Sequence, residues 1–134
     1  MIKYGENFLK QVGGNISARF DLDKTGSPIY ETDSKGRRHY HIRLRLDSDN
    51  PELSNVTYKL HSSYYDPVRE SDDREGGFAE ELTSYGDYPV QVEAQVGSRL
   101  FTNRFMLSDL LEEGHGDALN DQAITDAIKT IKKY

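Results

Sequence analysis

Apolar and polar residues alternate along several segments of the first hundred residues. The pattern is clearest in NISARFDLD at residues 15–23, RRHYHIRLRLDSD at 37–49, NVTYKLH at 55–61 and DYPVQVEAQV at 87–96. The apolar positions are Ile16, Ala18, Phe20 and Leu22; Tyr40, Ile42, Leu44 and Leu46; Val56, Tyr58 and Leu60; and Tyr88, Val90, Val92, Ala94 and Val96. Because successive side chains of a β-strand point to opposite faces, each segment predicts a strand with one buried face.

Further segments add to the predicted strands. SRLFTNRFML at 98–107 follows a turn at Gly97 and Ser98, and weaker signals lie in SPIYET at 27–32 and GGFAEEL at 76–82. Turn-forming residues separate the segments, in KTGSP, DSKGR, DSDNPE and SDDREGG. We therefore predict an all-β fold, an immunoglobulin-like antiparallel β-sandwich of about seven to eight strands with a C-terminal α-helix.

The last part of the chain changes to a helical period. SDLLEE, which Ser108 opens, predicts one helical turn, and DALNDQAITDAIKTIKKY at 117–134 predicts a helix. The apolar stripe of that helix consists of Leu119, Ala123, Ile124, Ala127, Ile128 and Ile131. We therefore expect an N-terminal extension at 1–14, the sandwich at 15–107 and a C-terminal helical segment at 108–134.

Composition argues against several functions. The 134 residues contain no cysteine, which excludes disulfides, thiolate chemistry and zinc fingers. A net charge of −6 argues against nucleic-acid binding, which needs a basic face. No apolar run is long enough to span a bilayer and no apolar leader opens the sequence, so we expect a cytoplasmic protein without membrane insertion. We identify no phosphate loop, acid–base pair or metal cluster, and we expect neither catalysis nor a cofactor.

Two aromatic motifs lie outside the regular strand pattern. LHSSY at residues 60–64 is followed by SYGDY at residues 84–88. The pair resembles the signature of YEATS domains, in which Leu-His-x-Ser-Phe precedes a Gly-Trp/Tyr-x-x-Phe element. The acidic loop between the motifs and the Tyr-Gly-Asp-Tyr form are most similar to the prokaryotic branch. The resemblance implies a non-catalytic module that binds acylated lysine, in a peptide or protein, through an aromatic groove at the loop end of the sandwich.

The resemblance also implies the residues that bind the ligand: His61, Ser63, Tyr64, Tyr85, Gly86 and Tyr88. In this scheme Tyr64 and Tyr85 are the walls of the groove, and Ser63 hydrogen-bonds the acyl amide. The residue types fit such a guest, because a flat amide packs well between aromatic faces and its buried polar groups need partners. We expect the Ser63 hydroxyl to meet one of them and the backbone near Tyr85 and Gly86 to meet the other.

The sequence departs from the family pattern at three positions. Tyr64 replaces a phenylalanine and so adds a hydroxyl group. Ser84 replaces a glycine, and a positive φ would be unfavourable there. Asp87 puts a carboxylate beside the expected groove. With Asp66, it suggests a second kind of guest, a cation such as methyl-lysine held by the aromatic residues.

Structural interpretations of the same residues remain open. Tyr88 is in phase with the strand that follows it, so it is equally suited to the core. His61 is suited to bonding the loop backbone. Ser63 with His61 suggests a nucleophile and its base, but alternate positions of a strand rarely aim at each other, and hydrolysis is disfavoured.

Other clusters suggest further alternatives. His39 and His41 share a strand face, and His115 is a conceivable third metal ligand. A basic stripe consists of Arg37, Arg38, Arg43 and Arg45, and an acidic run consists of Glu70, Asp72, Asp73 and Glu75; we expect both to be solvated. The alternative function is a protein–protein interaction or scaffolding domain of a larger prokaryotic signalling or effector protein. There the arginine face or the C-terminal helix would bind the partner.

Overall fold

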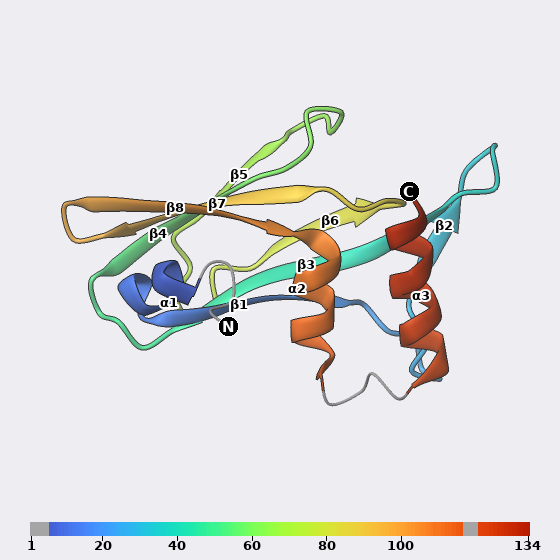
Figure 1. Ribbon diagram of the computed structural model, residues 1–134, viewed down its shortest axis with the longest axis horizontal. Helices are drawn as coiled ribbons and strands as arrows, with labels where there is room; N and C mark the ends of the chain where they lie inside the picture. The colour runs from blue at the N-terminus through green and yellow to red at the C-terminus, as the bar shows by residue number, and fades with distance from the viewer. Residues whose placement is uncertain (1–5, 117–120) are drawn as a thin grey trace. The chain divides into compact units, whose positions relative to one another are not determined.

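The computed structural model describes residues 6–116 and 121–134, which form eight strands and three helices (Figure 1). The elements are α1 (Glu6–Val12), β1 (Gly14–Phe20), β2 (Tyr30–Thr32), β3 (Arg38–Ser48), β4 (Leu53–Lys59), β5 (Val68–Ser71), β6 (Glu80–Ser84), β7 (Pro89–Val96), β8 (Arg99–Met106), α2 (Leu107–Gly114) and α3 (Gln122–Lys133). The strands form two antiparallel sheets, so the predicted mostly-β fold with a C-terminal helix is confirmed.

The chain forms two compact units, each made of three stretches of sequence. The first contains residues 45–80 and 89–106 together with the described residues up to 16. The second contains residues 17–44, 81–88 and the described residues from 107 onward. The two predicted motifs therefore lie in different units, LHSSY in the first and SYGDY in the second.

The first unit is built on a sheet with the strand order β5-β4-β7-β8. In the β4–β7 ladder, Val56 pairs with Ala94 and Tyr58 with Val92, and all four side chains are buried, as the alternation predicts. The ladder of β4 with β5 includes Glu70 opposite Thr57. The start of the acidic run is therefore a strand rather than the expected solvated loop.

Helix α1 covers part of this unit, and it lies within the N-terminal extension that we expected at 1–14, where no helix was predicted. Phe8 of α1 and Phe105 of β8 meet edge to face, with their ring centroids 5.9 Å apart. Phe8 and Val12 are buried, which is the i, i+4 spacing of one helical face. A helix of only 7 residues offers too short a periodic signal to be recognised.

Phe78 in the first unit is buried with a φ of 48°, which side chains other than glycine rarely adopt. The Tyr58 hydroxyl donates a 2.8 Å hydrogen bond to the Phe78 carbonyl oxygen. Burial raises the pKa of this hydroxyl, which therefore remains a donor at neutral pH. Tyr58 thus holds the backbone in this unfavourable conformation.

We expect Tyr58→Phe to destabilise the protein by about 1–3 kcal/mol, because it removes the hydrogen bond to a buried carbonyl while it keeps the ring. Urea unfolding monitored by circular dichroism measures the change. The matched control is Tyr65→Phe, since the Tyr65 side chain is 106% exposed and its hydroxyl is in water. Equal stability of the two variants would contradict this role of Tyr58.

The second unit contains β2, β6 and the larger parts of β1 and β3, with β3 in the centre of the sheet order β1-β3-β2 and β6 paired to β3. Tyr40, Ile42 and Leu44 of β3 are buried, as predicted. The Tyr40 ring contacts both Phe20, at 5.2 Å, and Tyr30, at 5.4 Å between centroids. An aromatic cluster therefore joins the three strands.

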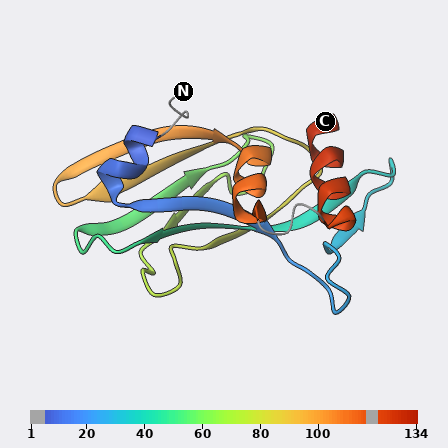
Figure 2. The ribbon, with the colours of Figure 1, turned by 60° about the horizontal axis from the view of Figure 1, so that its bottom comes forward.

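Helices α2 and α3 lie side by side in both views (Figures 1 and 2). The buried face of α3 consists of Ile124, Ala127, Ile128 and Ile131, which confirms the predicted stripe; Leu119 lies outside the described residues. Lys132 of α3 forms an ion pair with Glu112 of α2. Helix α2 begins one residue before Ser108 and is longer than the single turn expected.

None of the described helices has the length and apolar character needed to cross a membrane.

Candidate functional site

The loop that carries LHSSY closes on itself in the first unit. The Leu60 N–H donates to the Pro67 carbonyl oxygen at 2.7 Å, which returns the chain to β5. Inside the loop, the His61 ring nitrogen Nδ1 accepts the Ser63 backbone N–H at 3.1 Å and lies 2.8 Å from Ser63 Oγ. Since Nδ1 accepts an N–H it carries no proton, so the hydroxyl donates to it as well. The expected backbone-bonding role of His61 is present.

The same contact corrects a geometric expectation. His61 and Ser63 were expected not to aim at each other, as alternate residues of a strand rarely do. They approach each other because β4 ends at Lys59 and residues 62–63 form a turn. In this turn the hydroxyl proton of Ser63 is directed to His61, and the Ser63 oxygen keeps its acceptor capacity. The Tyr64 side chain is half-buried beside them and Tyr65 is exposed.

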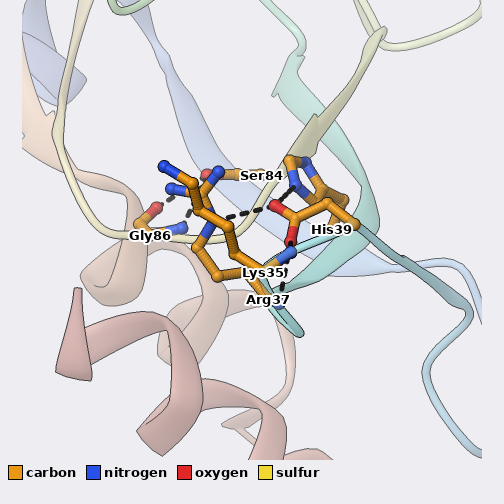
Figure 3. Close-up of polar contacts among 6 residues, drawn as sticks. Lys35, Arg37, His39, Ser84 and Gly86 are labelled. Carbon is orange, nitrogen blue, oxygen red and sulfur yellow. Dashed lines mark hydrogen bonds and ion pairs between the residues drawn. The ribbon is translucent and has the colours of Figure 1, made fainter.

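The turn that carries SYGDY lies in the second unit and is held by a serine. Ser84 Oγ accepts the Gly86 N–H at 3.2 Å and donates to the Gly86 carbonyl oxygen at 2.7 Å (Figure 3). The Gly86 N–H is thus engaged within the turn, and the expectation that the backbone near Tyr85 and Gly86 meets a guest stays a prediction. Ser84 does not have a positive φ; among the described residues other than glycine, Phe78 alone has one.

Tyr85 projects from this turn and is contacted by three side chains of the same unit. The guanidinium carbon of Arg37 lies 4.2 Å from the centroid of the Tyr85 ring, which is a cation–π contact. The His39 ring is tilted at 5.1 Å, and the Tyr134 ring meets Tyr85 edge to face at 5.8 Å. A Cβ atom on Gly86 would lie 3.0 Å from that of Tyr134, so glycine permits this close approach.

Asp33 holds Arg37 and His39 in place beside the Tyr85 ring. Its Oδ2 atom accepts from Arg37 Nε and lies 2.8 Å from His39 Nε2, while its Oδ1 accepts the backbone N–H groups of Lys35 and Arg37 (Figure 3). The hydrogen bond with His39, followed by those with Arg37 and Lys35, lowers the pKa of Asp33. Asp33 is therefore an ionised anchor for the turn between β2 and β3.

Tyr88 and Asp87, which follow Tyr85, have structural contacts. The Tyr88 side chain is 7% exposed, which favours the core alternative. The Asp87 carboxylate accepts both the backbone N–H of Ser108, at 2.9 Å, and its hydroxyl, at 2.7 Å. Asp87 thus caps α2 in place of Ser108, and a helix N-terminus favours a carboxylate there. This engagement removes Asp87 from the proposed cation site.

The remaining candidate clusters are engaged in other ways. His39 and His41 each approach a carboxylate, that of Asp33 and that of Glu31, and the described residues contain no group of three or more possible metal ligands. The side chains of the basic stripe pair with acids or stack: Arg37 with Asp33, Arg43 with Glu81, Arg45 with Asp47, and Arg38 over Tyr30. This is the solvated, paired surface that we expected.

Two of the three comparisons with known proteins found similar domains. The sequence model of the prokaryotic YEATS domain matches residues 40–103. Two similar solved structures are the Yaf9 YEATS domain recognising a succinylated histone H3 peptide and the yeast AF-9 homolog protein Yaf9. Each is 14% identical with a TM-score of 0.50 and covers 70% of this chain, with 68% and 63% of the other chain matched. The comparison with curated proteins gave no match.

The chain thus has a fold similar to that of the Yaf9 YEATS domain, and its structural neighbours have an immunoglobulin-like β-sandwich fold. Residues 40–103 match the sequence model of the prokaryotic YEATS domain, in agreement with the resemblance drawn from the motifs.

Proposed function

We propose that this protein is a non-catalytic recognition module that binds acylated lysine, with Tyr64 and Tyr85 as aromatic contacts and Ser63 as the polar anchor. The observation that carries the proposal is the match to the prokaryotic YEATS domain, which includes both motifs. The Yaf9 YEATS domain, which has a similar fold, recognises a succinylated histone peptide. A cytoplasmic location and an acylated protein partner belong to the same proposal.

The hydrogen bonds of Ser63 support its role as an acceptor. Its hydroxyl proton is directed to His61 Nδ1, so the oxygen lone pairs remain available for the N–H of an acyl amide. An ester has no N–H donor, so an acceptor at Ser63 would favour the amide of acyl-lysine over an ester. Its carbonyl oxygen needs a second donor.

The experiment is a titration with one lysine peptide in unmodified, acetyl, crotonyl and trimethyl forms. We expect saturable binding of an acyl form, and we expect Tyr85→Ala to weaken it about tenfold or more, because a lost aromatic contact costs about 1 kcal/mol and further packing is lost with it. Tyr30→Ala is the matched control, since Tyr30 also carries a stacked arginine in the second unit.

A double-mutant cycle of Tyr64→Ala and Tyr85→Ala tests that both tyrosines act on the same guest. The changes that the two substitutions cause in the binding free energy should then be non-additive. The changes caused by Tyr65→Ala and Tyr85→Ala should be additive. Absence of binding by every peptide, with circular dichroism showing folded protein, would exclude the reader function. Preference for the trimethyl form would instead assign the site to a cation.

A further inference from the structure

Strand β8 is a long edge of the sheet in the first unit. In the order β5-β4-β7-β8 it pairs with β7 alone, as far as the structure describes the chain (Figure 1). Its ladder with β7 runs from Arg99 to Met106 without a bulge, and it contains neither proline nor glycine. The other edge strand, β5, has only 4 residues. Proteins usually shorten or bulge an exposed edge, because its unpaired backbone groups recruit other strands.

We propose that β8 pairs with β8 of a second copy of this chain, in an antiparallel register centred on Asn103. The two four-stranded sheets then join into one. In this register Thr102 lies opposite Arg104 of the second copy, and Leu100 lies opposite Met106 of the second copy. The proposal does not depend on the acyl-lysine function proposed above.

The backbone N–H groups of the even-numbered residues of β8 point to its open side. The Arg104 N–H donates to Asn103 Oδ1 at 2.7 Å, so it is directed away from the ladder with β7. Met106 lies opposite Pro89, which has no N–H to exchange in a hydrogen-bonded pair. Because hydrogen-bonded and non-hydrogen-bonded pairs alternate along an antiparallel ladder, the other even-numbered residues also direct their N–H groups outward. A second strand must therefore bond to these residues.

The side chains select one of the registers that this alternation permits. A centre at Arg104 would place two guanidinium groups opposite each other, which is unfavourable. A centre at Thr102 would place Leu100 opposite an arginine, and it would put Met106 beyond the start of the second strand. The centre at Asn103 instead pairs the exposed apolar side chains of Leu100, 58% exposed, and Met106, 39% exposed.

The same register brings unlike charges together. Glu93 of β7 lies opposite Thr102, and its side chain keeps 20% exposure beside Lys59. Arg104 of the second copy is next in this row, and neighbouring strands are about 4.8 Å apart. Its long side chain can reach across the small Thr102 to the Glu93 carboxylate, and the two-fold symmetry repeats this ion pair.

Asn103 lies on the symmetry axis and exchanges its hydrogen bond when the strands pair. The Arg104 N–H then donates to the Thr102 carbonyl oxygen of the second copy, which releases the Asn103 amide. The Cα atoms of a non-hydrogen-bonded pair are about 4.5 Å apart, so the two Asn103 amides meet across the axis. Both polar groups therefore keep a partner in the dimer.

The first test is sedimentation equilibrium of the full chain over a range of concentrations. We expect a reversible monomer–dimer equilibrium, because one strand pair buries less than the roughly 1,200–2,000 Å² of a stable interface. Thr102→Pro removes an outward N–H and keeps the ladder with β7, so the dimer should weaken about tenfold or more. Thr102→Ala keeps that N–H and is the matched control. If circular dichroism shows that Thr102→Pro is unfolded, Arg104→Glu replaces it, because it puts like charges beside Glu93.

The second test determines the register, and a chain without cysteine permits single introduced thiols. Asn103→Cys should give a disulfide-linked dimer as the main product of mild oxidation, because the Cα separation across the axis suits a disulfide. Leu100→Cys and Met106→Cys should each stay unlinked alone, since each thiol is about 20 Å along the strand from its own mate. An equimolar mixture of these two variants should form the mixed disulfide, also if Asn103→Cys fails to fold.

A wild-type protein that stays monomeric up to the millimolar range overturns the proposal. A dimer that the folded Thr102→Pro or Arg104→Glu variant leaves unchanged also overturns it. Linking of Leu100→Cys or Met106→Cys alone, without the mixed disulfide, contradicts the register centred on Asn103. Each of these results leaves the reader function intact, because the peptide titrations test residues outside β8.

Discussion

Gly114→Ala is expected to destabilise the second unit by about 3 kcal/mol or more, at the upper end of overpacking effects. A Cβ atom at this position would lie 2.0 Å from the Ala18 carbonyl oxygen and 2.9 Å from the Ala18 carbonyl carbon. Both are backbone atoms of β1, so no side-chain rotation relieves the overlap. Either α2 moves away from β1 or the strand shifts, and each change disrupts buried packing.

The contacts around Gly114 show what such a movement would break. Its carbonyl oxygen accepts a 2.9 Å hydrogen bond from Arg19 Nη1, and the next residue, His115, accepts the Phe20 N–H. These bonds attach the end of α2 to consecutive residues of β1. A shift of α2 large enough to accommodate a methyl group would lengthen both hydrogen bonds.

Thermal and urea unfolding of Gly114→Ala give the measurement, and Gly116→Ala is the matched control. A Cβ atom on Gly116 would meet nothing within 4 Å, so that variant should keep the wild-type midpoint. If Gly114→Ala unfolds at the same midpoint as Gly116→Ala, the close packing of α2 on β1 is not present in solution.

The sequence predicted the buried faces of strands well, because burial along a strand is recorded locally in every second residue. Tyr40, Ile42, Leu44 and Leu46 are all buried. Leu22 continues the alternation of its segment but is 39% exposed, because β1 ends at Phe20 and Leu22 forms only an isolated bridge with Pro28. The alternation therefore predicted the buried face of the strand correctly, but it placed the end of the strand beyond Phe20, where β1 ends.

The surroundings of the candidate site could not be predicted in this way, because they depend on residues far apart in the chain. Arg37 and Tyr134 both contact Tyr85. The DSKGR segment gave a turn signal, and that turn carries Arg37, but no local pattern shows which ring a turn residue will cover. The capping of Ser108 by Asp87 is a similar case, since an aspartate in a turn usually bonds its own backbone.

His115 has a structural role in the second unit. The sequence analysis considered it a conceivable third metal ligand, whereas the side chain is fully buried and its Nε2 atom accepts the Phe20 N–H at 2.9 Å. Its ring also stacks on that of Phe20, with centroids 5.5 Å apart and an angle of 23°. His115 therefore supplies an acceptor to a strand and packs as an aromatic residue.

His115→Leu is expected to lower the free energy of unfolding by about 2–4 kcal/mol. The variant keeps an apolar side chain of moderate size, but the buried Phe20 N–H loses its acceptor, which alone costs about 1–3 kcal/mol. The lost stacking on Phe20 adds to this cost. Urea unfolding at neutral pH measures the change, and hydrogen exchange at the Phe20 amide should become faster in the variant.

His41→Leu is the matched control, because its ring is on the half-exposed face of β3 and its contact is with the exposed carboxylate of Glu31, at 3.4 Å. We expect that variant to stay within about 1 kcal/mol of the wild type, as for other surface ion pairs. A comparable loss in both variants would show that the effect comes from introducing leucine rather than from the buried acceptor. A stable His115→Leu protein with a protected Phe20 amide would mean that this N–H finds its acceptor elsewhere.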